Sequence, residues 1–257
     1  MEEKILIIIN EIRKAKNLSE LSVINLSDTL RDDIGFTSFD LAELTVRIED
    51  EFDIDIFEDG LVNTVGEIIE NMGLFLVDQH KSYTYEDLLQ RINATKSYIP
   101  LMQTNNLYDF FLNMILSLIS DQPLILLDSD TKMNELEGIE NTDINEPKNI
   151  LFDDKADIDD LINSVLTSKS EITIFTSGTT GQPKKVVHTI GTLTRSTRIS
   201  FKYHSQIWAF AFNPTHMAGL QVFFQAFANK NALINVFNKN RVEVYELLSE
   251  YHVTHIS

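Results

Sequence analysis

The segment that most constrains this sequence runs from Ile172 to Lys185. It starts with an apolar run, Ile172 to Phe175, that is typical of a buried strand, and continues as Thr, Ser and Gly residues before Pro183 and two lysines. A Gly-rich loop lets backbone N–H groups come close to phosphate oxygens, because glycine has no Cβ. The spacing is not that of a Walker A loop. From the residues alone, this is either a phosphate-binding loop or a Ser/Thr/Gly-rich surface turn.

The same loop resembles the phosphate-binding signature of the adenylate-forming ligases, the acyl-CoA synthetases and peptide-synthetase adenylation domains. The agreement covers every motif position from Thr176 to Lys184. The resemblance implies an ATP phosphate site formed by Thr176, Ser177, Gly178, Thr179, Thr180, Gly181 and Lys184. The family usually has glycine where this chain has Lys185, a change expected to stiffen the exit of the loop.

Composition excludes several classes of function. The chain has 257 residues, 43% of them hydrophobic, which suits one or two folded domains. Its net charge of −18 argues against nucleic acid and anionic membranes as partners. There is no cysteine, so no disulfide or thiolate metal site is expected, and we expect a cytoplasmic location. The longest apolar run, Phe110 to Ser120, is too short to span a bilayer.

The acidic residues are unevenly distributed. Residues 1–73 hold 18 acidic and 6 basic residues, a net charge of −12, whereas the rest of the chain has a net charge of −6. This difference predicts two domains, at 1–73 and 74–257. In the first, apolar residues recur at helical spacing and predict a bundle of three or four helices. The helix after Ser38 is expected to bury Leu41, Leu44, Ile48 and Phe52 and to expose Asp40, Glu43, Arg47 and Asp50.

Ser38 stands where this second helix is expected to start. An isolated serine there is most simply an N-cap. The stretch from Asp32 to Leu44, however, resembles the attachment region of acyl carrier proteins. The resemblance implies that a phosphopantetheinyl transferase links a phosphopantetheine arm to Ser38. Thr37 and Phe39 replace the usual Asp and Leu beside this serine. A carrier-like fold that is never modified is the alternative.

Strand-like and helix-like segments alternate after residue 73, which predicts an α/β domain. Helices are expected at 86–92, 107–119, 158–166, 189–200 and 242–251, and strands at 74–77, 82–85, 124–127, 208–212, 232–237 and from 253. The strand and helix around Tyr83 to Leu88 resemble the opening of the ligase N-terminal domain. The predicted fold is therefore a helical carrier bundle followed by an apparently incomplete α/β ligase domain.

A second site signal follows the strand at 208–212. The segment from Asn213 to Leu220 contains a Pro-x-His-x-x-Gly pattern. This pattern resembles the ligase segment that lines the acyl pocket, and it implies that His216 and Gly219 are acyl-pocket residues. A helix-capping or core histidine is the alternative for His216. No residue is predicted to be catalytic or to bind a metal through its side chain.

Together the two resemblances imply that a carboxylic acid is activated with ATP and Mg²⁺ as an acyl-adenylate and then transferred to the phosphopantetheine thiol on Ser38. A fatty, hydroxy-aromatic or amino acid substrate remains open. The ligase family has further chain after the segment that ends here, so either the sequence is truncated or a second polypeptide supplies the rest. The alternative function is a carrier and interaction module that carries an inactive ligase fragment.

Overall fold

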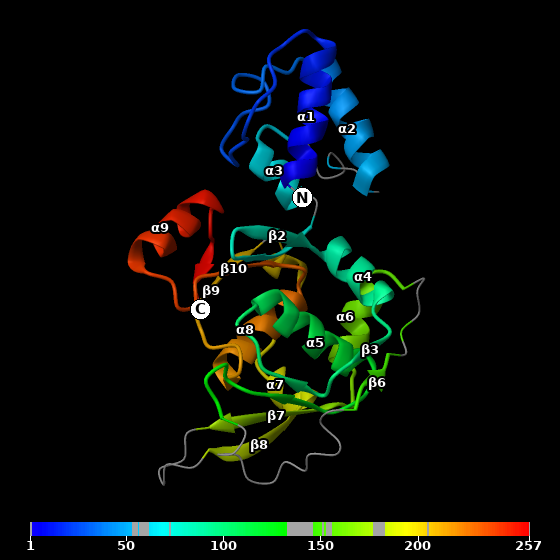
Figure 1. The fold of residues 1–257 in the computed structure, drawn as a ribbon, viewed down its shortest axis with the longest axis vertical. Coiled ribbons are helices and arrows are strands. Elements are labelled where there is room, and N and C mark those ends of the chain that lie inside the picture. The colour runs from blue at the N-terminus through cyan, green and yellow to red at the C-terminus, as the bar shows by residue number, and fades with distance from the viewer. Residues whose placement is uncertain are drawn as a thin grey trace.

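The computed structural model describes residues 2–52, 56, 62–71, 73–132, 146–150, 152, 156–176, 183–204 and 206–256. The first part contains helices α1 (Glu2–Ala15), α2 (Ser38–Phe52) and α3 (Val65–Asn71), which form the bundle at the top of Figure 1. The apolar face of α1 packs on Leu41, Leu44 and Ile48 of α2 within one buried cluster. The three core positions that the structure describes in α2 are therefore those expected from the helical periodicity.

The long connection from α1 to α2 is held in place by buried residues. Leu30, Ile34 and Phe36 are each at most 3% exposed. Arg13 of α1 is also buried, and its guanidinium donates to the carbonyl oxygens of Ser19 and Ile34. The connection is thus fixed to the helices at several points before Ser38.

The second part contains two larger sheets. The five-stranded sheet has the order β11-β9-β10-β1-β2, with β1 (Leu74–Asp78), β9 (Ile207–Phe210), β10 (Ala232–Asn235) and β11 (His255–Ile256) parallel to one another. The remaining strand, β2 (Lys81–Thr84), is antiparallel to β1. The carboxyl ends of the four parallel strands therefore lie at one edge of the sheet.

The four-stranded sheet has the order β4-β5-β7-β8. Its strands β4 (Leu101–Met102), β5 (Leu124–Leu126) and β7 (Glu171–Thr176) are parallel, and β8 (Lys184–Thr189) is antiparallel to β7. A separate antiparallel pair consists of β3 (Ser97–Tyr98) and β6 (Lys148–Asn149).

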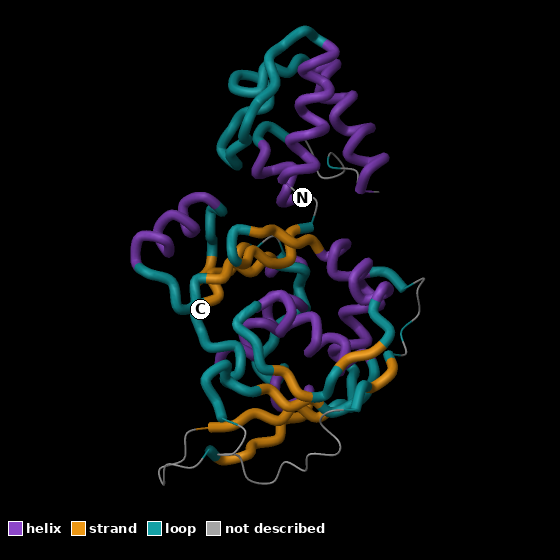
Figure 2. The backbone as a smooth tube through the Cα atoms, viewed as in Figure 1, coloured by secondary structure: helices purple, strands orange, loops and turns teal. Residues whose placement is uncertain are grey.

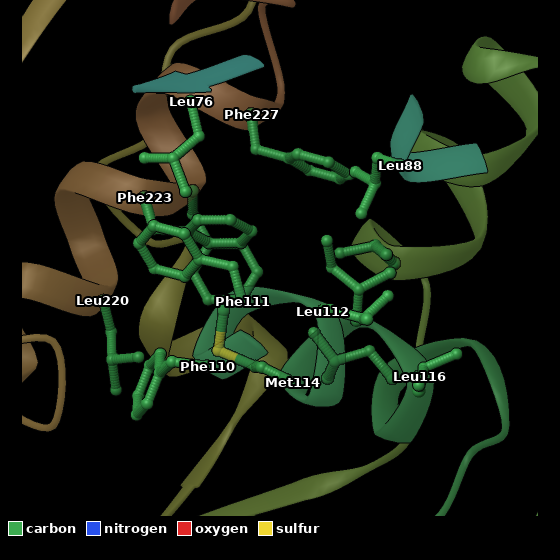
Figure 3. Close-up of a cluster of buried hydrophobic side chains, with 14 of the residues drawn as sticks. Leu76, Leu88, Phe110, Phe111, Leu112, Met114, Leu116, Leu220, Phe223 and Phe227 are labelled. Carbon is green, nitrogen blue, oxygen red and sulfur yellow. The ribbon is translucent and has the colours of Figure 1, made fainter. Parts of the chain in front are cut away.

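Helices fill the space between the two larger sheets. These helices are α4 (Tyr85–Ala94), α5 (Leu107–Ile119), α6 (Ile158–Leu166), α7 (Ile190–Leu193) and α8 (Met217–Phe227). Helix α9 (Arg241–Glu250) instead contributes Leu247 to the buried cluster on the other face of the five-stranded sheet, and a short 3₁₀ turn covers Phe201–Tyr203. Figures 1 and 2 show α5 and α8 between the two bands of strands. Phe111 of α5 lies at the centre of this layer, 4.5 Å from the Phe223 ring and 5.5 Å from the Phe210 ring between centroids (Figure 3).

The predicted fold class is confirmed: a helical bundle precedes an α/β domain. The helices expected at 107–119 and 158–166 have those bounds. The helix expected at 189–200 is wrong beyond Leu193, because the backbone of Arg198 bonds to the Gln225 side chain of α8 instead of continuing a helix. The strand expected from residue 253 is β11, which covers His255–Ile256 and pairs with β9.

The domain boundary at residues 73 and 74 stays a prediction. Helix α3 ends at Asn71 and strand β1 begins at Leu74. Gly73 between them has a φ of +69°, a left-handed conformation that favours glycine. Among the described residues, no helix is both long and apolar enough to cross a membrane.

Candidate functional site

Ser38 is the first residue of α2, but the preceding residue caps the helix. The Thr37 carbonyl accepts the first helical bond, from the Leu41 N–H. Both the N–H and the hydroxyl of Thr37 donate to Asp40 Oδ2, at 2.5 and 2.6 Å. Thr37 is thus the N-cap, at the position where carrier proteins usually have Asp. The N-cap alternative for Ser38 is therefore wrong, and its hydroxyl is not used to close the helix.

The Ser38 side chain is exposed, and its Oγ accepts a hydrogen bond from the Arg31 guanidinium at 3.3 Å. Phe39 beside it is 90% exposed. Figure 1 shows α2 beginning at the end of the bundle that points away from the two sheets. The hydroxyl is accessible to another protein, as an attachment site requires. The helix N-terminus also favours the negative charge of an attached phosphate.

Asp40 departs from its expected place on the outer face of α2. It is only 7% exposed and also accepts a hydrogen bond from Lys16 Nζ at 2.5 Å. Burial raises the pKa of Asp40, but the hydrogen bonds from Lys16 and Thr37 and the charge of Lys16 lower it by more, so its pKa lies below the usual aspartate range. The carboxylate thus connects α1 to the residue before Ser38.

Asp40→Asn should reduce the free energy of unfolding of the carrier by about 1–2 kcal/mol at pH 7, because the variant loses the charge-assisted bonds. Because the folded pKa is lowered, the stabilisation is complete above the unfolded value of about 4 and is lost as pH falls through the folded pKa. Urea unfolding of both proteins from pH 7 to pH 2 should show the difference shrinking below pH 4. Exposed Asp50→Asn on the same helix is the control, and an equal loss in both variants would contradict the assignment.

In the α/β domain, a cavity of about 470 Å³ lies at the carboxyl ends of strands from both sheets. Its lining is mostly polar and includes Thr104, Asn105, Asn106, Asp128, Ser129, Asp130, Asn213, Thr215, His216, Asn235 and Asn238, together with Leu107, Phe110, Pro214 and Phe237. These residues follow β4, β5 and β9, end or follow β10, or begin α5. In parallel sheets, ligands bind at this edge of the strands.

Asp128 organises one wall of the cavity. Its Oδ1 accepts hydrogen bonds from the Asn213 amide, at 2.7 Å, and from the Thr215 hydroxyl. Its Oδ2 lies 3.7 Å from Nε2 of His216. This carboxylate therefore joins the end of β5 to the turn between β9 and α8. Sequence analysis missed Asp128, although a polar residue directly after a short apolar strand was the available signal.

His216 occupies the N-cap position of α8, but its side chain makes no capping hydrogen bond, and that side chain is 56% exposed. It is thus neither a capping nor a core histidine, and its imidazole lines the cavity. Gly219 differs: it is buried in α8 and is not among the lining residues described. A Cβ there would lie 2.3 Å from the Asn213 carbonyl oxygen, so Gly219 permits close packing of α8 on the turn. Their roles in acyl binding stay predictions.

The predicted phosphate loop connects β7 to β8. Its flanks are adjacent, because Thr176 at the end of β7 pairs directly with Lys184 at the start of β8. Both side chains are exposed. The predicted residues Ser177, Gly178, Thr179, Thr180 and Gly181 lie outside the described residues. Since β5 and β7 are parallel neighbours, the end of β7 lies at the same edge of the sheet as Asp128.

Comparisons with known proteins find family matches in both parts of the chain. The family model described as AMP-binding enzyme matches residues 122–257, and the model for a phosphopantetheine attachment site matches residues 7–71. An acyl carrier protein of Exiguobacterium sibiricum is 36% identical over 70 residues, which cover 26% of this chain and 89% of that protein. This chain therefore belongs to the AMP-binding enzyme family and includes an acyl carrier unit with a phosphopantetheine attachment site.

Solved structures with a similar arrangement include O-succinylbenzoate coenzyme A synthetase (MenE) from Bacillus subtilis in complex with AMP. It is 15% identical with a TM-score of 0.48, and the match covers 72% of this chain and 57% of that chain. The N-terminal subdomain of NpsA from Klebsiella oxytoca, in complex with 3-hydroxyanthranilyl-AMSN, is 12% identical with a TM-score of 0.45, covering 71% and 55%. The chain thus spans somewhat more than half the length of these proteins.

Proposed function

We propose that this chain takes part in the ATP-dependent activation of a carboxylic acid and in its transfer to a carrier thiol. The acid would attack the α-phosphate of ATP, so that an acyl-adenylate forms and pyrophosphate leaves. The phosphopantetheine on Ser38 would supply the thiol that displaces AMP. The observation that carries the proposal is the presence, in one chain, of an exposed serine at the start of a carrier helix and of an AMP-binding domain with a cavity at its strand ends.

ATP would bind at the end of β7. Lys184 pairs with Thr176 at the start of β8, and its cation would offset part of the charge of the β- and γ-phosphates, which the segment Ser177 to Gly181 would hold. Neutralising the charge on the phosphates is the main requirement of such a site. Mg²⁺ would supply further positive charge to offset that of the phosphates. The described residues contain no cluster of three His, Cys, Asp or Glu side chains able to hold a metal, so no protein ligand is assigned.

The cavity beside His216 would receive the acid. It lies at the strand edge that also carries the phosphate loop, which would bring a carboxylate and the α-phosphate together. Helix α2, of which Ser38 is the first residue, begins at the end of the bundle that points away from the two sheets (Figure 1). The carrier would therefore reorient relative to the α/β domain, or it would be loaded by another copy of the chain.

Lys184→Ala should reduce acid-dependent ATP–pyrophosphate exchange by about 100-fold, because it removes one charge from the phosphate site. The assay uses a panel of fatty, hydroxy-aromatic and amino acids, with the chain alone and with a second polypeptide that supplies the remaining ligase segment. Lys169→Ala is the matched control, since this exposed lysine lies before β7, at the opposite end of the strand from Thr176.

Equal exchange in both lysine variants would contradict the assigned role of Lys184. The alternative function, a carrier module with an inactive ligase fragment, predicts a different pattern. In that case Ser38 would accept phosphopantetheine, yet no acid would support exchange and no acyl group would appear on the arm, even with the second polypeptide present. Intact mass of the phosphopantetheinylated chain after incubation with ATP and acid measures that acyl group.

A further inference from the structure

Arg31 contacts the very oxygen that the carrier would modify. Its Nη2 lies 3.3 Å from Ser38 Oγ, and both side chains are exposed. Sequence analysis gave no role to this arginine. The contact comes from the connection before α2 and not from the helix itself, so it places a cation directly at the attachment point.

The other basic side chains of the carrier are engaged elsewhere. Ion pairs hold Lys4 to Glu51, Lys14 to Glu20, Lys16 to Asp40, and Arg47 to Glu11 and Glu43, and Arg13 is buried on two carbonyl oxygens. Within the described part of the carrier, the Arg31 side chain donates a hydrogen bond to Ser38, and no carboxylate lies within ion-pair distance of the Arg31 guanidinium. Its charge is thus available to an anion on Ser38.

The backbone that carries Arg31 is fixed. The Leu30 side chain is fully buried, and the Leu30 carbonyl accepts from the Phe36 N–H at 2.8 Å. Asp33 Oδ2 accepts from the N–H and the hydroxyl of Thr29 at 2.8 and 2.7 Å, and these bonds lower the pKa of Asp33. The turn from Thr29 to Asp33 therefore presents Arg31 toward Ser38 without a large loss of backbone freedom on binding.

A phosphodiester on Ser38 would add negative charge to an acidic surface. Asp32 and Asp33 are exposed in the same turn, and the whole unit has a net charge of −12. A guanidinium can bind two oxygens of one phosphate through parallel hydrogen bonds, and the N-terminus of α2 favours the same charge.

Building on the proposed carrier function, we propose that Arg31 is a positioning residue that binds the phosphodiester of the attached phosphopantetheine. It holds the phosphate at the start of α2 and sets the direction in which the arm leaves the carrier. Because the pair is exposed, the contact is weak enough to be exchanged when a partner enzyme takes up the arm.

The test compares the full chain before and after complete phosphopantetheinylation, checked by intact mass, as wild type and as Arg31→Gln. Hydrogen exchange of the peptides that cover residues 26–45 is measured by mass spectrometry. Attachment should slow exchange in wild type by about threefold, the size expected for an exposed ion pair, and the effect should shrink at high salt. Arg31→Gln should show no slowing and Arg31→Lys a smaller one. Lys14→Gln, which removes an exposed charge on α1, should behave as wild type.

Equal slowing in wild type and Arg31→Gln, or no slowing in wild type, overturns the role of Arg31 while the attachment site stands. A chain that gains no phosphopantetheine in any variant overturns both proposals. All these positions are exposed, so the variants should keep the fold, and identical exchange in the α5 peptides verifies this.

Discussion

Gly219→Ala should destabilise the α/β domain by about 3 kcal/mol. The added Cβ would lie 2.3 Å from the carbonyl oxygen of Asn213, 3.0 Å from its carbonyl carbon and 3.1 Å from Cα of Pro214. These are backbone atoms, so no side chain can rotate away. The turn itself is fixed, because Asp128 binds Asn213 and Thr215. Urea unfolding followed by the fluorescence of Trp208, the single tryptophan, measures the loss.

Gly191→Ala is the matched control for this prediction. Gly191 lies in α7, and the nearest atom to an added Cβ is Thr189 Oγ1 at 3.9 Å. Alanine also favours helix over glycine, so this variant should be neutral or more stable by up to about 1 kcal/mol. If the two variants unfold at the same urea concentration, the close approach of α8 to the turn is not the reason for glycine at 219.

A loss of stability in Gly219→Ala would also show that the close approach of α8 helps to shape the cavity. The turn that the Cβ pushes against carries Asn213, Thr215 and His216, three of the lining residues. The Pro-x-His-x-x-Gly pattern then has a physical basis: the glycine lets the helix approach, and the approach places the histidine at the cavity. The sequence contains this pattern, and its resemblance implied the same role for both residues. The structure shows that Gly219 permits close packing, whereas His216 lines the cavity.

Segments with strong local signals were predicted well. The helix at Leu107–Ile119 is apolar on most sides and starts after the N-cap Asn106. Thr64, directly before α3, likewise accepts from the Glu67 N–H, and the Glu67 carboxylate accepts from the Asn63 N–H. Local periodicity and capping chemistry depend on residues within a few positions, which a sequence displays directly.

Contacts between distant segments could not be predicted. Asp40 has the helical spacing of an outer residue, yet it binds Lys16, 24 positions earlier, in a partly buried hydrogen bond. Asp128 meets Thr215 across 87 positions. Such pairs depend on how elements pack, and neither residue type nor spacing specifies them. The cavity was therefore found only in the structure. The phosphopantetheine attachment motif and the phosphate-loop motif were both visible in the sequence.

Ser38→Ala should abolish phosphopantetheine attachment completely, the largest effect expected for any single substitution in the carrier. The reason is chemical: only the hydroxyl can form the phosphodiester, and alanine has none. The measurement is intact mass after incubation with coenzyme A and a broad-specificity phosphopantetheinyl transferase. Wild type should gain one phosphopantetheine and Ser38→Ala none. Ser22→Ala, which removes an exposed hydroxyl from the connection between α1 and α2, should gain one as wild type does.

The structure indicates that Ser38→Ala removes the attachment hydroxyl without removing a helix cap. A serine at a helix start commonly serves as the N-cap, and its loss would then weaken the helix by about 1 kcal/mol. Here Thr37 and Asp40 close the helix through their own hydrogen bonds, so Ser38→Ala should keep α2 and the stability of the bundle. Unchanged far-ultraviolet circular dichroism would verify this. If the folded wild-type chain gains no phosphopantetheine, the proposed carrier function is wrong. If Ser38→Ala still gains one, the attachment site is another residue.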